Sequence, residues 1–191
     1  MKRRRAIGRI LLAGGATAAA YGSYEWFALT KNPDLQYLSS KIPLLTALSE
    51  SIIPATDTPG ATEAGVIRFM IPLLTQCTDK KTLNRFIRGL QDLEAHTRSR
   101  YDKDFLQCTE QEKEKILLYF EHLSQPVSDR LGRAKNKVLG SPFFETLKQY
   151  TVESFCISEK GASLALRYIP VPGRYQGCVP MEPGQRAWAT K

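Results

Sequence analysis

The chain has 191 residues, enough for one domain of ordinary size, and carries 27 Lys and Arg against 19 Asp and Glu, a net charge of +8. Five of the positive charges lie within the first nine residues, so the rest carries only +3, and charge alone does not indicate a nucleic-acid-binding protein. No long apolar run occurs beyond the N-terminus, which excludes a protein with several membrane spans. The only two histidines, His96 and His122, exclude a multihaem protein or a His-rich metal site.

The N-terminus has the layout of an export signal. A basic head is followed by the uncharged residues 10–24, a stretch too short for a spanning helix of about 20 residues. The pair Arg4-Arg5 is typical of a twin-arginine signal, and Ala18-Ala19-Ala20 offers a cleavage site. A general secretory signal and an uncleaved anchor remain open. The twin-arginine route carries folded cargo, so a partner bound in the cytoplasm can cross with this chain.

Helical periodicity begins after this segment. The spacing of four apolar residues predicts a helix that ends at Pro54: Ile42, Leu45, Leu48 and Ile52. A second helix is expected from near Thr62, with Pro72 kinking it or ending it early. Its apolar positions are Val66, Phe69, Met70, Leu73, Leu74 and Cys77.

Three further helices have clear start signals. Asp79 begins one, and Thr109 with Glu112 forms a capping box for the next, whose apolar residues run to Leu123. Ser141-Pro142 signals the last, with Ser141 as cap and Pro142 at the first helical position. We expect a common core of Leu83, Phe86, Ile87, Leu90, Ile116, Leu117, Phe120, Phe144 and Leu147.

These elements predict an all-α fold: a single helical domain of about five or six helices with an extended, Pro/Gly-rich C-terminal tail. The expected organisation is an export signal and linker over residues 1–29, the helical domain over 30–160, and the tail over 161–191. No internal repeat and no convincing strand pattern occurs in the sequence.

No pattern predicts a catalytic, cofactor-binding or metal-binding residue. Glycine-rich nucleotide loops and the C-x-x-C-H haem motif are absent from the sequence. Asp102 and Asp104 resemble the start of a calcium loop, but Gln107 and Lys113 stand where such a loop needs Gly and Glu. We interpret this segment as a solvated turn and both histidines as surface or boundary residues.

The four cysteines are Cys77, Cys108, Cys156 and Cys178. In an oxidising compartment they could form up to two disulfides, with three full pairings open. The apolar helix face around Cys77 favours a buried thiol, whereas Cys178 lies in the tail and is expected to be the most accessible.

Two stretches resemble a known family. Residues 53–66, Ile-Pro-Ala-Thr-Asp-Thr-Pro-Gly-Ala-Thr-Glu-Ala-Gly-Val, look like the opening signature of the gluconate 2-dehydrogenase subunit 3 family. Residues 168–180, Tyr-Ile-Pro-Val-Pro-Gly-Arg-Tyr-Gln-Gly-Cys-Val-Pro, followed by Trp188, resemble its ending. The resemblance covers roughly residues 42–188. One position departs from the family pattern: Pro72 stands where an acidic residue is expected.

The resemblance implies a non-catalytic small (gamma-type) subunit of a periplasmic sugar or sugar-acid dehydrogenase. The implied partner is a flavoprotein similar to the glucose-methanol-choline (GMC) oxidoreductases, which holds FAD, so this chain itself binds no cofactor. A multihaem cytochrome c subunit often completes such complexes. The implied role is assembly, stabilisation and co-export through the twin-arginine translocase, with membrane association through partner subunits or an uncleaved signal. Nucleic acid is not an expected partner.

The tail is the candidate partner interface. Its prolines prevent a helix and leave little freedom to lose on binding, while Tyr and Trp are favoured interface anchors. The candidate residues are Tyr168, Pro172, Tyr175, Cys178, Val179, Met181 and Trp188. An alternative is that the tail wraps its own helical domain. A structural envelope protein without a redox partner and a free-standing exported enzyme using Cys178 or a histidine are the alternative functions.

Overall fold

The structure, a computed structural model, describes residues 26–125, 136, 139–171, 173–174, 177–178, 180–181 and 183–189. Over these residues the protein is helical and has no strand, which confirms the all-α prediction. Six α-helices lie completely within the described ranges. None of the helices described is long and apolar enough to cross a membrane.

The first two of these helices are α2 (Leu35–Ser40) and α3 (Ile42–Ile52). The buried face of α3 is centred on Leu44, Leu45 and Leu48. The sequence prediction that Ile42 belongs to this face is wrong: Ile42 is exposed, because it opens the helix and its side chain stands outside the leucine stripe that packs inward.

Helix α4 (Val66–Pro72) continues directly into the π-helical turn η1 (Leu73–Cys77). The helix begins at Val66 rather than near Thr62, because Gly65 adopts a left-handed conformation (φ 67°) that cannot continue a helix. The regular α-helix ends at Pro72, as its missing N–H predicts, and the chain widens into the π turn.

The longest helix, α5 (Lys80–Tyr101), leads through the 3₁₀ turn η2 (Phe105–Gln107) to α6 (Glu110–Ser124). Asp79 caps α5 by accepting from Thr82 N, and Thr109 and Glu112 form the predicted capping box. The periodicity of the sequence suggested that Leu123 belongs to the core, and this prediction is wrong. The side chain of Leu123 is 64% exposed on the last turn of α6.

The chain then forms α8 (Phe143–Ile157) and the π-helical turn η3 (Gly161–Ala165). Pro142 is itself the N-cap of α8, and no side chain caps this end, so the predicted cap at Ser141 is wrong by one residue. The turn η3 lies inside the segment that the sequence assigns to the tail, and the domain boundaries themselves stay a prediction.

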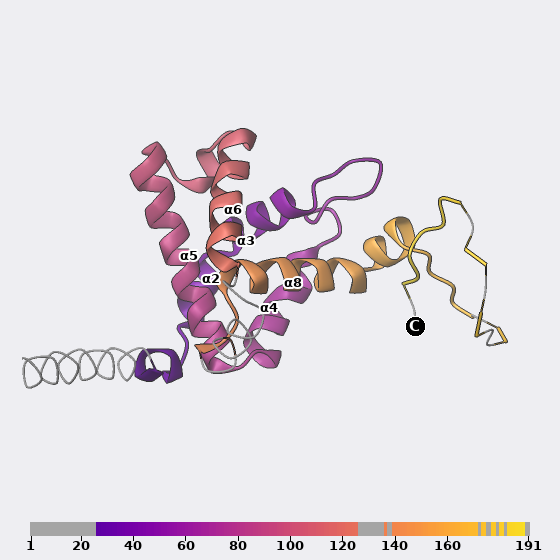
Figure 1. Ribbon diagram of the computed structural model, residues 1–191, viewed down its shortest axis with the longest axis horizontal. Coiled ribbons are helices and arrows are strands. Elements are labelled where there is room, and N and C mark those ends of the chain that lie inside the picture. The colour runs from indigo at the N-terminus through magenta and orange to yellow at the C-terminus, as the bar shows by residue number, and fades with distance from the viewer. Residues whose placement is uncertain are drawn as a thin grey trace, which may run out of the picture.

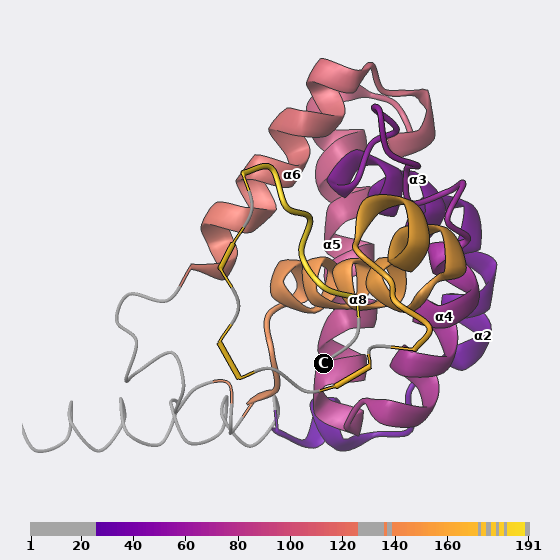
Figure 2. The ribbon, with the colours of Figure 1, turned by 90° about the vertical axis from the view of Figure 1, so that its right-hand side faces the viewer.

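The core lies where α8 crosses α5, α6 and α4 (Figures 1 and 2). Phe143 sits between Phe86 and Phe120, with ring centroids 5.3 and 5.8 Å away. The nine residues predicted to form one core are all buried in one cluster, which confirms that prediction.

Gly89 allows α5 and α8 to approach this closely. A Cβ atom at this position would collide with Cβ and Cγ of Phe143. Since these atoms stand at the root of the Phe143 side chain, they cannot move aside without moving α8.

We therefore expect Gly89→Ala to lower the free energy of unfolding by about 1–3 kcal/mol, the usual cost of overpacking. The same change at an open helix position would stabilise by up to about 1 kcal/mol. Urea unfolding measures the difference, with Gln91→Ala on the exposed face of α5 as the matched control. An unchanged or higher stability of Gly89→Ala would contradict the close packing.

Candidate partner-binding face

The signature loop, residues 53–65 between α3 and α4, is held by Glu50. Its Oε2 accepts from Thr62 N at 2.7 Å and its Oε1 accepts from Ala55 N at 3.2 Å. A Cβ at Gly60 would collide with the Glu50 carboxylate, so glycine allows the loop to close over it. One carboxylate at the end of α3 thus holds both sides of the loop.

Backbone hydrogen bonds complete this loop. Ala61 N donates to Ile53 O at 2.9 Å, and Val66 N donates to Ala61 O at 3.0 Å. Pro59, Gly60 and Ala61 are buried, whereas the tip, residues 54–57, is exposed. The base of the loop is therefore part of the body, and only its tip projects (Figure 1).

The hydrogen bonds also set the charge state of Glu50. Partial burial works to raise the pKa of this carboxyl, but the hydrogen bonds from Thr62 and Ala55 outweigh it and hold the pKa below its usual range. Glu50 is therefore ionised at neutral pH and acts as a structural anion.

The C-terminal loop, residues 167–188, is closed at its base. Arg167 N donates to Ala187 O at 2.8 Å, and Ala189 N donates to Arg167 O at 3.0 Å. The Arg167 guanidinium lies over the Trp188 ring, 4.5 Å from its centroid, and Arg186 donates to Leu164 O. The tail thus returns to the end of η3. Among the described residues, no hydrophobic side chain beyond Ala165 belongs to the core cluster or packs against it.

Apolar side chains are exposed along this end of the molecule. Met181 is 85% exposed and Val171 81%. Tyr168, Trp188, Ile157 and Leu164 are also exposed. Single exposed apolar residues are ordinary, but a concentration of them indicates an interaction surface.

Of the candidate interface residues, Tyr168, Cys178, Met181 and Trp188 are exposed, and their contact with a partner stays a prediction. Pro172, Tyr175 and Val179 lie outside the described residues, as do the export residues Arg4 and Arg5.

The two loops lie on the same side of the protein. Figure 1 shows both projecting to the right of the helical body, and Figure 2 views this side directly. Lys160 Nζ, just before η3, lies 2.9 Å from Glu63 Oε1 of the signature loop. The described parts of the two sequence stretches that carry the family resemblance therefore lie on one side of the body, which we call the loop face.

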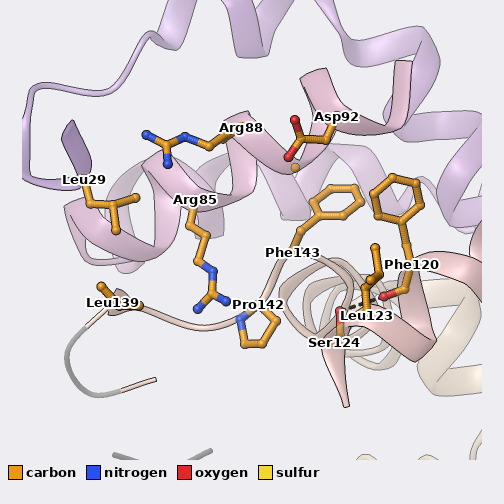
Figure 3. A pocket seen from close by; sticks show the side chains of 11 residues that line it. Leu29, Arg85, Arg88, Asp92, Phe120, Leu123, Ser124, Leu139, Pro142 and Phe143 are labelled. Carbon is orange, nitrogen blue, oxygen red and sulfur yellow. Dashed lines mark hydrogen bonds between the residues drawn. The ribbon is translucent and has the colours of Figure 1, made fainter. Parts of the chain in front are cut away.

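A cleft of about 430 Å³ lies on another part of the body, between α5, α6 and the start of α8 (Figure 3). Arg85 donates to Gly140 O and thereby holds the chain leading into α8. Leu123 points into this cleft beside Phe120, which explains its exposure. The described residues that line this cleft include no His or Cys.

A groove of about 700 Å³ lies beside the signature loop, against α6 and α8. Its lysines are paired: Lys113 Nζ lies 2.8 Å from Glu110 Oε1, and Lys148 Nζ lies 3.4 Å from Glu121 Oε1. The paired lysines and glutamates line this groove together with Leu117, Leu118 and Phe144. The groove is therefore partly apolar, and it adjoins the loop face.

The cysteines and histidines are dispersed. All four cysteines are free thiols, and Cys77 is exposed at the end of η1, where the widened turn carries it out of the core; the predicted burial of this thiol is wrong. Burial is the main cause that raises the pKa of the Cys108 thiol, and the nearby Glu112 carboxylate raises it further. His96 is half-buried and stacks on Tyr119 at 4.2 Å. In the described ranges no three His, Cys, Asp or Glu residues group as metal ligands.

Asp102 and Asp104 have structural roles. Asp102 ends α5 in a left-handed conformation (φ 53°), and Asp104 caps η2 and pairs with Arg98 at 2.9 Å. This agrees with the interpretation of the segment as a turn.

The model of the family described as gluconate 2-dehydrogenase subunit 3 matches residues 39–173. The match spans the signature loop and the first part of the C-terminal loop, and it confirms the family resemblance. No curated protein matches the chain, and no solved structure matches it.

Glu50 provides a direct test of the loop face. We expect Glu50→Ala to lower the free energy of unfolding by about 1.5–3 kcal/mol, because the substitution removes the charged acceptor of two hydrogen bonds. The backbone N–H groups of Ala55 and Thr62 then lose their partner. The folded-state pKa is lowered, so the stabilisation by Glu50 is complete above the unfolded value of about 4.3 and decreases as pH falls below it.

Urea unfolding between pH 7 and pH 3 measures both effects, and limited proteolysis at residues 54–57 reports release of the loop. Glu114→Ala, an exposed carboxylate of α6, is the matched control. Equal stability and equal protease resistance of the Glu50 and Glu114 variants would contradict the role of Glu50.

Proposed function

Because the chain belongs to the gluconate 2-dehydrogenase subunit 3 family, we propose that it is the non-catalytic small subunit of a periplasmic, FAD-dependent sugar or sugar-acid dehydrogenase. The family name makes it an accessory subunit of a dehydrogenase. In this proposal the flavin belongs to a GMC-type catalytic subunit, and this chain stabilises and assembles that subunit.

One observation carries the proposal: the loop face presents apolar side chains on a segment whose base is already closed. Val171 and Met181 are more than four-fifths exposed, while Arg167 and Trp188 hold the ends of the loop together. A closed loop loses less conformational freedom on binding than an open tail does, so more of the contact energy remains for affinity. Such a loop suits docking to a large, preformed protein surface.

The proposed role in export follows from the N-terminal sequence. The Arg4-Arg5 pair and the uncharged stretch after it are typical of a twin-arginine signal. A folded flavoprotein without its own signal could cross the membrane bound to this chain. A multihaem cytochrome c subunit would then receive the electrons in the periplasm.

The docking surface can be tested with the full complex. We expect Val171→Ser combined with Met181→Ser to weaken binding of the catalytic subunit by about tenfold or more, because each change removes an exposed apolar contact. Co-purification of the flavoprotein, followed by its absorbance, and titration of the purified subunits measure the loss.

Leu106→Ser is the matched control, since Leu106 is an exposed apolar residue of η2, outside the loop face. Deletion of residues 170–191 is the stronger variant, and circular dichroism checks that it stays folded. Full affinity of a folded deletion variant would contradict docking through the C-terminal loop.

The export role has its own test. Arg4→Lys combined with Arg5→Lys is expected to retain this protein and the catalytic subunit in the cytoplasm, because both depend on one signal. Fractionation and periplasmic dehydrogenase activity report the result. Lys2→Arg is the control substitution. Normal periplasmic activity in the double variant would refute co-export.

A further inference from the structure

A second surface lies at the opposite end of the molecule, where the described chain begins. Residues 26–30 form a helical turn against the start of α5. Leu29 is buried, and Asn84 Nδ2 donates to Leu29 O at 2.9 Å and to Lys31 O at 2.8 Å. The turn is thereby held in a defined position on the body.

This fixed turn displays two aromatic rings. Trp26 is 46% exposed and Phe27 68% exposed. Lys81 Nζ lies 3.5 Å from the centroid of the Trp26 ring, and Lys31 Nζ lies 5.7 Å from that of Phe27. Aromatic rings and ammonium groups are therefore interleaved on one small surface. We call these residues, together with Lys80, the aromatic–lysine patch.

The lysines of this patch differ in their interaction partners from most other lysines of the described ranges. Lys41, Lys103, Lys113, Lys148 and Lys160 each pair with a glutamate. By contrast, Lys80 donates to the Asn32 side chain at 3.0 Å, and Lys31 and Lys81 lie over aromatic rings; within the described ranges none of the three pairs with a carboxylate.

Two of the carboxylates near the patch accept hydrogen bonds from the first turns of helices. Asp79 caps α5, and its Oδ2 accepts from Thr82 N at 3.1 Å. Asp34 caps α2, and its Oδ1 accepts from Tyr37 N at 2.9 Å. Glu25 precedes Trp26 in the sequence. These carboxylates offset the formal charge of the three ammonium groups, so the attraction of the patch for anions rests on the position of Lys31 and Lys81 beside the exposed rings and not on a net positive charge.

Further aromatic residues precede the patch in the sequence. Tyr21, Tyr24, Trp26 and Phe27 place four aromatic residues within seven positions, directly after an uncharged stretch. Trp and Tyr concentrate where a bilayer meets water, since their rings have an apolar body and a polar tip. Lysines beside them attract anionic lipid headgroups.

We propose that the aromatic–lysine patch docks on the surface of an anionic phospholipid bilayer. Trp26 and Phe27 enter the headgroup region, and Lys31, Lys80 and Lys81 contact lipid phosphates. The proposal is independent of the function proposed above. It applies to the uncleaved chain and to a chain cut after Ala20. Figure 1 shows the turn of residues 26–30 (indigo) and the C-terminal loop (yellow) on opposite sides of the helical body, so docking through this turn leaves the loop face clear of the lipid.

The two tryptophans of the chain provide a test with a built-in control. Trp188→Phe leaves Trp26 as the single tryptophan, and Trp26→Phe leaves Trp188. Both variants are made in a full-length chain whose Lys2, Arg3, Arg4, Arg5 and Arg9 are replaced by Gln, so that the leader contributes no positive charge. Vesicles of brominated lipid, either neutral phosphatidylcholine or one-third phosphatidylglycerol, then quench any tryptophan within the headgroup region.

We expect quenching and a blue shift of Trp26 on the anionic vesicles, with Trp188 unchanged. Lys31→Gln, Lys80→Gln and Lys81→Gln together should weaken anionic vesicle binding by about 100-fold, given the usual contribution of a lysine near such a surface. Lys115→Gln, an exposed lysine of α6, is the matched control and should change it little. Circular dichroism confirms that the variants stay folded.

Three results would overturn the proposal. Unquenched Trp26 would mean that the patch faces water or another protein. Equal quenching of both tryptophans would mean non-specific adsorption. Equal binding to neutral and anionic vesicles, unaffected by the lysine changes, would mean that the apolar leader alone holds the chain on the lipid.

Discussion

The packing of Phe143 over Gly89 positions most of the described structure. Because Gly89 lacks a side chain, the first residue of α8 lies directly on α5, and its ring fills the space between Phe86 and Phe120. Three helices meet at this one side chain. The direction in which α8 leaves this contact determines where η3 and the tail begin.

Further along α8, a hydrogen bond extends this arrangement to the other side of the body. Thr78 Oγ1 and Tyr150 OH lie 2.6 Å apart and join the end of η1 to the middle of α8. Lys160, just beyond α8, then reaches Glu63 of the signature loop. Glu50 holds that loop from the end of α3. The loop face is thus built on the core through a short series of contacts, and its geometry depends on the α5–α8 packing.

The molecule has two dissimilar ends. One displays aromatic rings beside lysines that pair with no carboxylate of the described residues, and the other displays apolar side chains on a closed loop. Most lysines elsewhere in the described ranges pair with glutamates, for example Lys113 and Lys148. The separate surfaces that we propose for lipid and for protein would orient a bound partner relative to the membrane.

Local sequence signals determined most of the helices and much of the core, but not α2 or the turn η3. Asp79 and the Thr109–Glu112 box begin helices where their side chains can satisfy free backbone N–H groups, a property that depends only on neighbouring residues. The apolar periodicity of α5 identified Phe86 as core for the same reason. The family, too, followed from two sequence stretches.

Tertiary structure decided what depends on residues distant in the chain. Periodicity placed Ile42, Leu123 and Cys77 on inward faces, but burial also requires a neighbouring element that covers the side chain, and these three side chains are exposed. Likewise, no spacing rule connects Lys160 to Glu63, which are 97 residues apart, or shows that the tail closes on Arg167. The sequence by itself determined the family and the helices α3, α4, α5, α6 and α8. Only the packing of α8 on α5 decided that the described parts of the two motifs lie on one side of the body, because that contact sets the path of the chain between them.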